Sequence, residues 1–196
     1  MTTVRSALSF HHLSTGALLV AICLAAPSAV AQNRIFDSRI MAPFVPTPEL
    51  VVEKMLELAD LKPSDTLYDL GSGDGRILFA AAQSYQATAV GIEINETLVN
   101  QTRARAEALG LSERVTVRKE DLLQADLSEA TVVTVYLLSS SNEQLRPKLE
   151  KELRPGTRVV SHNFLFEGWT PKATEEIDGS GRVHRIYLYE IGGSNK

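Results

Sequence analysis

A glycine-rich turn that joins a short apolar strand to a helix is the feature that most limits how this chain can fold. Residues 66–70 form a run typical of a buried strand, and Gly-Ser-Gly-Asp-Gly-Arg follows at positions 71–76. Glycines at such a turn allow positive φ angles and let the backbone approach a ligand closely. The loop therefore indicates a ligand-binding α/β fold, with a simple tight turn as the alternative if the loop is taken alone.

Strand and helix patterns alternate along most of the chain. Apolar residues recur at helical spacing over residues 48–58, 77–82, 96–109 and 147–153. Strand patterns occur over residues 66–70, 87–92, 115–118, 131–138 and 157–161, and a closing β-hairpin is expected from residues 172–178 and 182–191. This order predicts an α/β fold with a doubly wound, mostly parallel sheet and a C-terminal antiparallel β-hairpin.

The N-terminal segment differs in composition from the rest of the chain. No charged residue lies between Arg5 and Arg34, and an apolar run over residues 16–26 is followed by a small-x-small site at residues 29–31. A basic start, a short apolar core and such a site are typical of a secretory signal peptide. Residues 1–31 are therefore expected to be a signal peptide or, alternatively, an N-terminal membrane anchor.

The two alternatives for this segment predict different locations. A cleaved signal peptide predicts an exported or periplasmic protein, whereas an anchor predicts membrane association through residues 13–30. The apolar core is shorter than the ~18–20 residues that span a bilayer comfortably. The remaining chain is expected to comprise a proline-punctuated lead-in over residues 32–46, a folded domain over 47–191 and a tail over 192–196. Thr47 is expected to cap the first helix of that domain.

Composition excludes several kinds of site. The formal net charge of -4 gives no basic field that would draw the chain to nucleic acid, so no nucleic-acid partner is expected. The single cysteine, Cys23, lies in the N-terminal segment, so the folded domain is expected to have no disulfide and no cysteine-based zinc site. No cluster with metal-ligand spacing occurs, and no bound metal is expected.

Acidic residues around the glycine loop narrow the class of ligand. Asp69 ends the preceding strand and Asp74 lies inside the loop, where two carboxylates would repel a pyrophosphate. Arg76 occupies the position of the third glycine of a dinucleotide-binding loop, and the Walker lysine is absent. A cationic ligand without phosphates fits better. S-adenosyl-L-methionine, which carries an ammonium and a sulfonium, is such a ligand.

Two further acids follow the next strands. Glu93 ends the second strand, where a carboxylate can accept both hydroxyls of a ribose. Asp121 follows the third strand, where it can accept from the exocyclic amine of adenine while Leu122 packs on the ring. A solvated acid is the alternative for Glu93. For Asp121 the alternatives are a plain turn residue and a role for Glu120 in its place. Together with Asp69, these acids at successive strand ends predict an S-adenosylmethionine site.

These residues resemble the first three signature motifs of class I S-adenosylmethionine-dependent methyltransferases, which have a Rossmann-like fold. Further segments resemble one family of them, the protein-lysine methyltransferases acting on mitochondrial ATP synthase subunit c and the adenine nucleotide translocase, with broad-specificity archaeal members. Those segments are residues 44–48, 68–76, 126–128, 145–149, 158–161 and 169–171. The resemblance covers about residues 43–191.

The resemblance implies a cofactor, a set of contacts and an acceptor. S-adenosyl-L-methionine is the implied cofactor, and a protein with an accessible lysine is the implied substrate. The residues implied to bind the cofactor are Thr47 at its methionine end, Asp69, Gly71 and Gly73 at its amino-acid part, Glu93 at the ribose and Asp121 at the adenine. The alternatives are methylation of a small amine or other small molecule, and a non-catalytic, exported binding or structural module.

The acceptor is expected at the carboxyl ends of the fourth and fifth strands. Tyr136 and His162 are the candidate catalytic residues there. The alternatives are a strand aromatic with a satisfied hydroxyl for Tyr136 and a simple hydrogen-bonding residue for His162. The Asn-Pro-Pro-Tyr motif of enzymes that methylate amide or nucleobase nitrogens is absent, which argues against those acceptors. A lysine must be neutral to attack, and an apolar channel would lower its pKa without a strong base.

Overall fold

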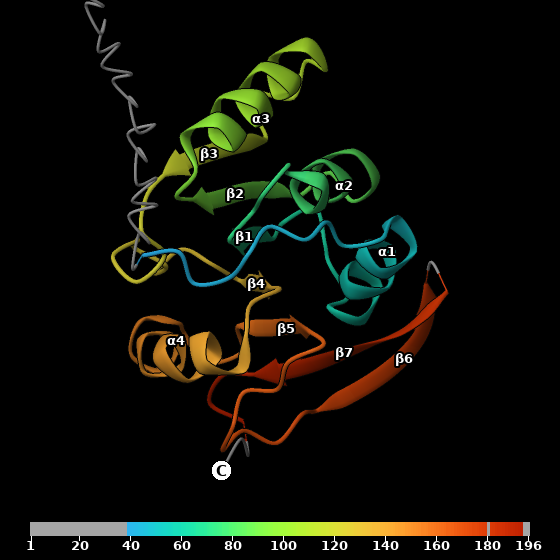
Figure 1. Ribbon diagram of the computed structural model, residues 1–196, viewed down its shortest axis with the longest axis vertical. Coiled ribbons are helices and arrows are strands. Elements are labelled where there is room, and N and C mark those ends of the chain that lie inside the picture. Colours follow the sequence, from blue (N-terminus) through green and yellow to red (C-terminus); the bar gives the residue numbers. More distant parts are fainter. Residues whose placement is uncertain (1–38, 180, 194–196) are drawn as a thin grey trace, which may run out of the picture. The chain divides into compact units, whose positions relative to one another are not determined.

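A seven-stranded sheet runs through the part of the chain that the computed structural model describes, residues 39–179 and 181–193. The strand order is β3-β2-β1-β4-β5-β7-β6 (Figure 1). The strands are β1 (Thr66–Leu70), β2 (Thr88–Glu93), β3 (Val115–Lys119), β4 (Val132–Val135), β5 (Arg158–His162), β6 (Ala173–Gly179) and β7 (Arg182–Glu190). Strands β1 to β5 pair in parallel, and β7 pairs antiparallel with both β5 and β6. The predicted doubly wound sheet with a C-terminal antiparallel hairpin is confirmed.

Four helices cover the two faces of this sheet unequally. They are α1 (Glu49–Leu58), α2 (Arg76–Ser84), α3 (Glu96–Ala108) and α4 (Ser139–Glu152). Because successive strand residues point to opposite faces, Leu67 packs in the core under α1, α2 and α3, whereas its neighbour Tyr68 packs in the core under α4. The irregular connection over residues 120–131 covers the rest of the α4 face. Figure 1 shows α4 on the opposite side of the sheet from α1 and α2.

The start of α1 differs from the sequence expectation. Pro48, with φ -57° and ψ 145°, occupies the N-cap position, and no described side chain caps the helix. The Thr47 hydroxyl instead lies 3.3 Å from Nδ1 of His162 on β5. The prediction that Thr47 caps α1 is therefore wrong, because a contact between distant parts of the chain takes the hydroxyl that local capping would use.

Helix α4 begins at Ser139, about two turns before the expected start at residue 147. Pro147 lies inside the helix, although proline removes one helical hydrogen bond. The residue is exposed, so water can reach the carbonyl group that lacks a partner. Leu145 and Leu149 on either side are fully buried, and their packing outweighs the local preference of proline.

The expected signal peptide or anchor over residues 1–31 lies outside the described residues, as do the lead-in up to residue 38, Ser180 and the last three residues of the expected tail. Among the residues that are described, no helix is long and apolar enough to cross a membrane.

Candidate cofactor and acceptor site

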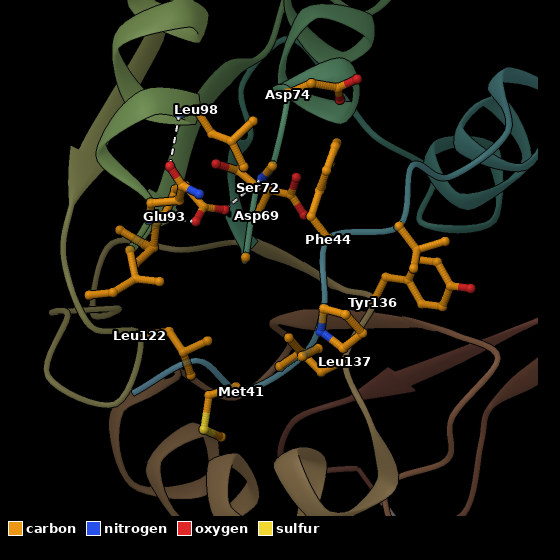
Figure 2. A pocket seen from close by; sticks show the side chains of 18 of the residues that line it. Met41, Phe44, Asp69, Ser72, Asp74, Glu93, Leu98, Leu122, Tyr136 and Leu137 are labelled. Carbon is orange, nitrogen blue, oxygen red and sulfur yellow. Dashed lines mark hydrogen bonds between the residues drawn. The ribbon is translucent and has the colours of Figure 1, made fainter. Parts of the chain in front are cut away.

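A cavity of about 310 Å³ lies at the carboxyl ends of β1, β2 and β4. Strands β1 and β4 are neighbours in the sheet, but their following segments lead away in opposite directions, toward β2 and β5 respectively. Ligands of open α/β sheets bind at such a switch point. The lead-in over residues 39–47 crosses this edge and contributes one wall of the cavity. Figure 2 shows Asp69, Ser72 and Glu93 gathered on one side of it, with Met41, Leu122 and Leu137 on the other.

The glycine loop brings backbone directly to the cavity. Gly71, Gly73 and Gly75 all have positive φ angles, at 82°, 54° and 75°. At Gly73 the absence of a side chain matters as well as the φ angle, because a Cβ there would lie 2.5 Å from the ring of Phe44 in the lead-in. Phe44 therefore rests on the loop only because residue 73 is glycine. Gly71 and Gly73 both line the cavity, as expected for a loop that approaches a ligand closely.

Asp69 is a buried acid at the end of β1. It is 4% exposed, and its Oδ1 accepts a hydrogen bond of 2.8 Å from the hydroxyl of Thr134 on β4. Burial raises the pKa of Asp69 to about 7, and the nearby charges of Glu93 and Asp74 add to the effect. A carboxylate held this way is destabilised until a cation approaches it, so the position fits an ammonium group.

Glu93 holds the glycine loop against β2. One carboxylate oxygen accepts from the amide of Gly73 at 2.9 Å, and the other accepts from the amide of Asn95 at 2.8 Å. The residue is 8% exposed and lines the cavity. An ionised carboxylate has about four acceptor positions, so two remain for a ligand with two hydroxyl groups.

Ser72 and Gly91 form a close contact beneath the loop that the sequence reasoning missed. A Cβ at Gly91 would lie 2.5 Å from Oγ of Ser72, so only glycine on β2 leaves room for this serine. The Ser72 hydroxyl is buried and has no hydrogen-bond partner among the described residues. Ser72 as a residue also lines the cavity, so the contact with Gly91 fixes the position of this part of the cavity wall.

Asp74, the acid inside the glycine loop, is paired with an arginine. Arg76 donates from Nε to its Oδ1 at 2.9 Å and from Nη2 to its Oδ2 at 2.5 Å. These contacts hold the pKa of Asp74 below its usual value and neutralise its charge locally. The same guanidinium donates to the carbonyl of Thr47 at 2.6 Å and so ties the lead-in to α2. Arg76 is close enough in the chain to donate to both carboxylate oxygens of Asp74. The acid that accompanies Asp69 is Glu93.

The third predicted acid occupies a turn. Oδ1 of Asp121 accepts from the amide of Leu123 at 2.9 Å, and its carbonyl accepts from the amides of Gln124 and Ala125. Glu120 and Leu122 line the cavity on either side of it, whereas Asp121 is not among the lining residues. The structure thus brings Asp69, Glu93 and Glu120 together around the cavity and places Asp121 behind them.

The acceptor side is built from Tyr136 and the residues behind it. The rings of Tyr136 and His162 have centroids 3.8 Å apart, and Tyr136 lines the cavity. Nδ2 of Asn163 donates to the Tyr136 hydroxyl at 3.4 Å from a backbone with φ 62°, which asparagine tolerates. His162 is fully buried behind the tyrosine. Burial, with His184 nearby, lowers the pKa of His162 to about 3, so the imidazole is neutral.

Two partners of the predicted site residues were missed. Thr134 lies directly opposite Asp69 in the register of β1 and β4. His184 on β7 lies 2.8 Å from Nε2 of His162 through its Nδ1. A polar residue within an apolar strand was the available signal for Thr134, whereas His184 lies between Val183 and Arg185 and gave no such signal. Among the described residues, no group of three or more histidine, cysteine, aspartate or glutamate side chains is arranged to hold a metal ion.

The sheet order, the glycine loop and the acidic cavity at the switch point define a class I S-adenosylmethionine-dependent methyltransferase. A model of the ANTKMT methyltransferase domain matches residues 69–173, and the chain belongs to this family. A protein-lysine N-methyltransferase of Saccharolobus islandicus is 49% identical over 76% of this chain and 94% of its own length. The adenine nucleotide translocase lysine N-methyltransferase of Mus musculus is 37% identical over 80% of this chain and 66% of its own length.

A solved structure supports the same class and the cofactor. It is a protein of Salinibacter ruber described as an RNA methyltransferase in complex with S-adenosyl-L-homocysteine. The two chains are 49% identical, with a TM-score of 0.73, over 76% of this chain and 95% of the other. The cofactor of the present chain is S-adenosyl-L-methionine, and the chain is a methyltransferase.

Proposed function

We propose that this methyltransferase transfers the methyl group of S-adenosylmethionine to the side-chain amine of lysine in a protein. The observation that carries the proposal is the 49% identity to a protein-lysine N-methyltransferase, extending over 94% of that relative. The acceptor side agrees with it, because Tyr136 on the cavity wall is backed by the neutral ring of His162. A wall without charge favours the uncharged form of an amine, which is the form that attacks.

The cofactor contacts proposed here follow the chemistry of each group. Asp69 binds the ammonium of the methionine part, and the backbone at Gly71 and Gly73 lies alongside it. Glu93 accepts from the ribose hydroxyls through its two remaining acceptor positions. Thr47 lies over the methionine end from the lead-in. At the adenine end, Glu120 lines the cavity, so we propose it ahead of Asp121 as the partner of the exocyclic amine.

The mechanism needs orientation more than proton transfer. When bound, S-adenosylmethionine would supply a methyl group on a sulfonium: an amine lone pair would form a bond to the methyl carbon in line with the carbon–sulfur bond that breaks, and the sulfur would leave as a neutral thioether. The chain holds the acceptor against Tyr136, keeps the lead-in over the cavity through Arg76 and Thr47, and excludes water with Phe44 and Leu137. His162 supplies no base, because its neutral ring has Thr47 and His184 at its two nitrogens. The proton of the acceptor is therefore lost to solvent before attack.

An RNA acceptor is the second candidate, because the similar Salinibacter ruber protein is described as an RNA methyltransferase. Two observations argue against it here. The formal net charge is -4, and β4 is followed by Tyr136-Leu137-Leu138-Ser139 rather than a motif that holds a planar nitrogen base. We therefore favour a protein substrate.

The N-terminal segment adds a separate proposal about location. We propose that residues 1–31 direct export or anchor the chain in a membrane, on the strength of their apolar run and small-x-small site. N-terminal sequencing of the protein purified from its own cells tests this. A first residue near Gln32 supports cleavage, and an intact Met1 in a detergent-free soluble fraction contradicts both alternatives.

Transfer of a radiolabelled methyl group to a lysate of the source organism tests the lysine acceptor. The full chain is incubated with labelled S-adenosylmethionine and with separated protein and RNA fractions. Acid hydrolysis of the labelled protein should release methylated lysine, and Asp69→Ala in parallel should label nothing. Label in RNA that survives protease treatment, or in glutamine, arginine or a small metabolite, contradicts the lysine proposal while leaving the methyltransferase class intact.

A further inference from the structure

Four groups from separate segments form one continuous hydrogen-bonded chain behind the cavity. Oγ1 of Thr47 lies 3.3 Å from Nδ1 of His162, and Nε2 of His162 lies 2.8 Å from Nδ1 of His184. Nε2 of His184 lies 3.1 Å from the carbonyl oxygen of Gly179. All three side chains are buried, with exposures of 5%, 0% and 8%. Thr47 lines the cavity, so the chain connects the cavity to the β6–β7 hairpin.

The last group of this chain fixes the direction of every hydrogen bond in it. The Gly179 carbonyl can only accept, so Nε2 of His184 carries a hydrogen and donates it. In a neutral ring the other nitrogen is then bare, and Nδ1 of His184 accepts from Nε2–H of His162. By the same reasoning Nδ1 of His162 is bare and accepts the hydroxyl hydrogen of Thr47.

With both rings neutral, only one arrangement of hydrogens satisfies all four groups, because the Gly179 carbonyl can only accept. Burial lowers the pKa of His162 to about 3, and His184 contributes to this shift, so the His162 ring is neutral near pH 7.

We propose that His162 and His184 are positioning residues that fix the polarity of the Thr47 hydroxyl, so that its oxygen presents only lone pairs to an amine or ammonium in the cavity. The proposal rests on this cavity being the methyl-transfer site, and only its acceptor arm rests on the lysine substrate. Arg76 already donates a hydrogen bond of 2.6 Å to the carbonyl oxygen of Thr47. The hydroxyl oxygen is therefore the acceptor of Thr47 that remains for a ligand. A hydroxyl turned the other way would direct its hydrogen at a cation.

The same imidazole also supports Tyr136. The tyrosine ring stacks on His162 with centroids 3.8 Å apart, so the ring that orders Thr47 also forms the back of the acceptor wall. Thr47 and Tyr136, which are 89 positions apart in the sequence, thus both contact the buried ring of His162. His184 holds that ring in a single tautomer. Thr47 and Tyr136 both border the cavity from this side.

Nitrogen NMR of the full chain tests the hydrogen positions directly. Long-range ¹⁵N–¹H spectra distinguish the two neutral tautomers, and the His162→Gln and His184→Asn variants assign the signals. The proposal expects both His162 and His184 as neutral Nε2–H tautomers. A protonated ring at pH 7, or an Nδ1–H tautomer at either position, overturns it.

Two substitutions at one position separate positioning from simple packing. His184→Leu removes the acceptor for Nε2–H of His162, and an unpaired buried N–H is costly. His162 should then move its hydrogen to Nδ1, which turns the Thr47 hydrogen into the cavity. His184→Asn is the matched control, because Oδ1 of asparagine can stand where Nδ1 stood and keep the Nε2–H tautomer. A purely structural role for His184 would leave the tautomer of His162 unchanged in both variants.

Binding and kinetics then identify which amine Thr47 faces. If it faces the cofactor, His184→Leu should weaken S-adenosylhomocysteine binding by roughly tenfold or more, the size expected for one charge-assisted hydrogen bond. If it faces the acceptor, cofactor affinity should hold while the acceptor KM rises by a similar factor. Either result, with recovery in His184→Asn, supports the proposal. A reversed tautomer with neither change, or an unchanged tautomer in a folded His184→Leu variant, overturns it.

Discussion

The two halves of the cavity differ in the charge of the residues that form them. The cofactor half, at the ends of β1, β2 and β3, contains Asp69, Glu93 and Glu120 and is acidic. The acceptor half, at the ends of β4 and β5, contains Tyr136 backed by His162 and is neutral. A permanent cation is bound by charge, whereas an amine that must lose its proton is better served by a wall without charge. The proposed function thus assigns cofactor binding to the acidic half and positioning of the nucleophile to the neutral half.

The largest expected effect is on the cofactor half, at Glu93. Glu93→Ala removes the proposed ribose acceptor and also leaves the amides of Gly73 and Asn95 without their partner. Each lost charge-assisted hydrogen bond costs ~1.5–3 kcal/mol, so S-adenosylhomocysteine affinity should fall by at least a hundredfold. Isothermal titration measures it. Glu96→Gln, an exposed acid paired only with Lys119 nearby, is the control and should bind normally. Wild-type affinity in a folded Glu93→Ala variant would contradict the assignment of cofactor binding to the acidic half of the cavity.

The next effect concerns the charge of Asp69. Its folded-state pKa of about 7 means that below pH 7 the cavity must release a proton before it can bind an ammonium. Cofactor affinity should therefore fall by up to about tenfold for each unit of pH below 7. Titration of the full chain at several pH values measures the slope, and Asp69→Asn should bind weakly with no such slope. A flat profile in the wild-type chain would mean that Asp69 does not meet the cofactor's cation.

The stability of the cofactor-free chain should depend on pH in the direction opposite to that of the cofactor affinity. Between pH 3.8, the ordinary pKa of an aspartate, and about pH 7, Asp69 holds a proton in the folded chain but not in the unfolded chain. The contribution of this group to stability is thus greatest at low pH and declines as pH rises through that window. Asp69→Asn removes the buried charge, so its melting temperature should exceed that of the wild type at pH 8 and match it near pH 5. Equal melting temperatures at pH 8 would contradict the inference that burial destabilises the ionised carboxylate of Asp69.

A smaller effect is expected where the lead-in meets the glycine loop. Gly73→Ala adds a methyl group 2.5 Å from the Phe44 ring, at a backbone φ of 54°. Gly110→Ala is a matched control, because its φ is 66° and an added Cβ meets no described atom within 4 Å. Both substitutions should cost about 1 kcal/mol of stability from the backbone angle. Only Gly73→Ala should also raise the KM for S-adenosylmethionine, and equal kinetics in the two variants would show that Phe44 does not close this cavity.

The positions of Asp69 and Glu93 at the cavity could be predicted from the sequence because the signals for them are local. Asp69 and Glu93 each end an apolar strand, and a glycine turn follows the first of them. Asp121 shows the limit of such reasoning. Side chains alternate at a strand end, so a shift of one residue exchanges a cavity acid, Glu120, for a turn acid. The order of strands and helices was equally readable, because each element carries its own pattern.

The neutral half was harder to predict because its partners meet only through the pairing of strands. Thr134 reaches Asp69 through the β1–β4 register, and His184 reaches His162 from β7, which is antiparallel to β5. Neither strand pairing produces a recognisable pattern at fixed spacing in the sequence. The cap assigned to Thr47 failed for the same reason, since a distant histidine engages its hydroxyl. The residues at strand ends could thus be predicted, whereas their partners on neighbouring strands could not.

The pH dependence of single-turnover methyl transfer tests the central claim most directly, because it asks whether the acceptor half contains a base. With the full chain saturated with S-adenosylmethionine and a lysine acceptor, the rate should rise about tenfold per pH unit until the acceptor amine deprotonates, below its free pKa of ~10.4. His162→Gln should keep the shape of that profile and lower the rate by less than the ~10²-fold that a general base contributes. A plateau with a midpoint near the ordinary histidine pKa of about 6.5, lost in His162→Gln, would contradict the account.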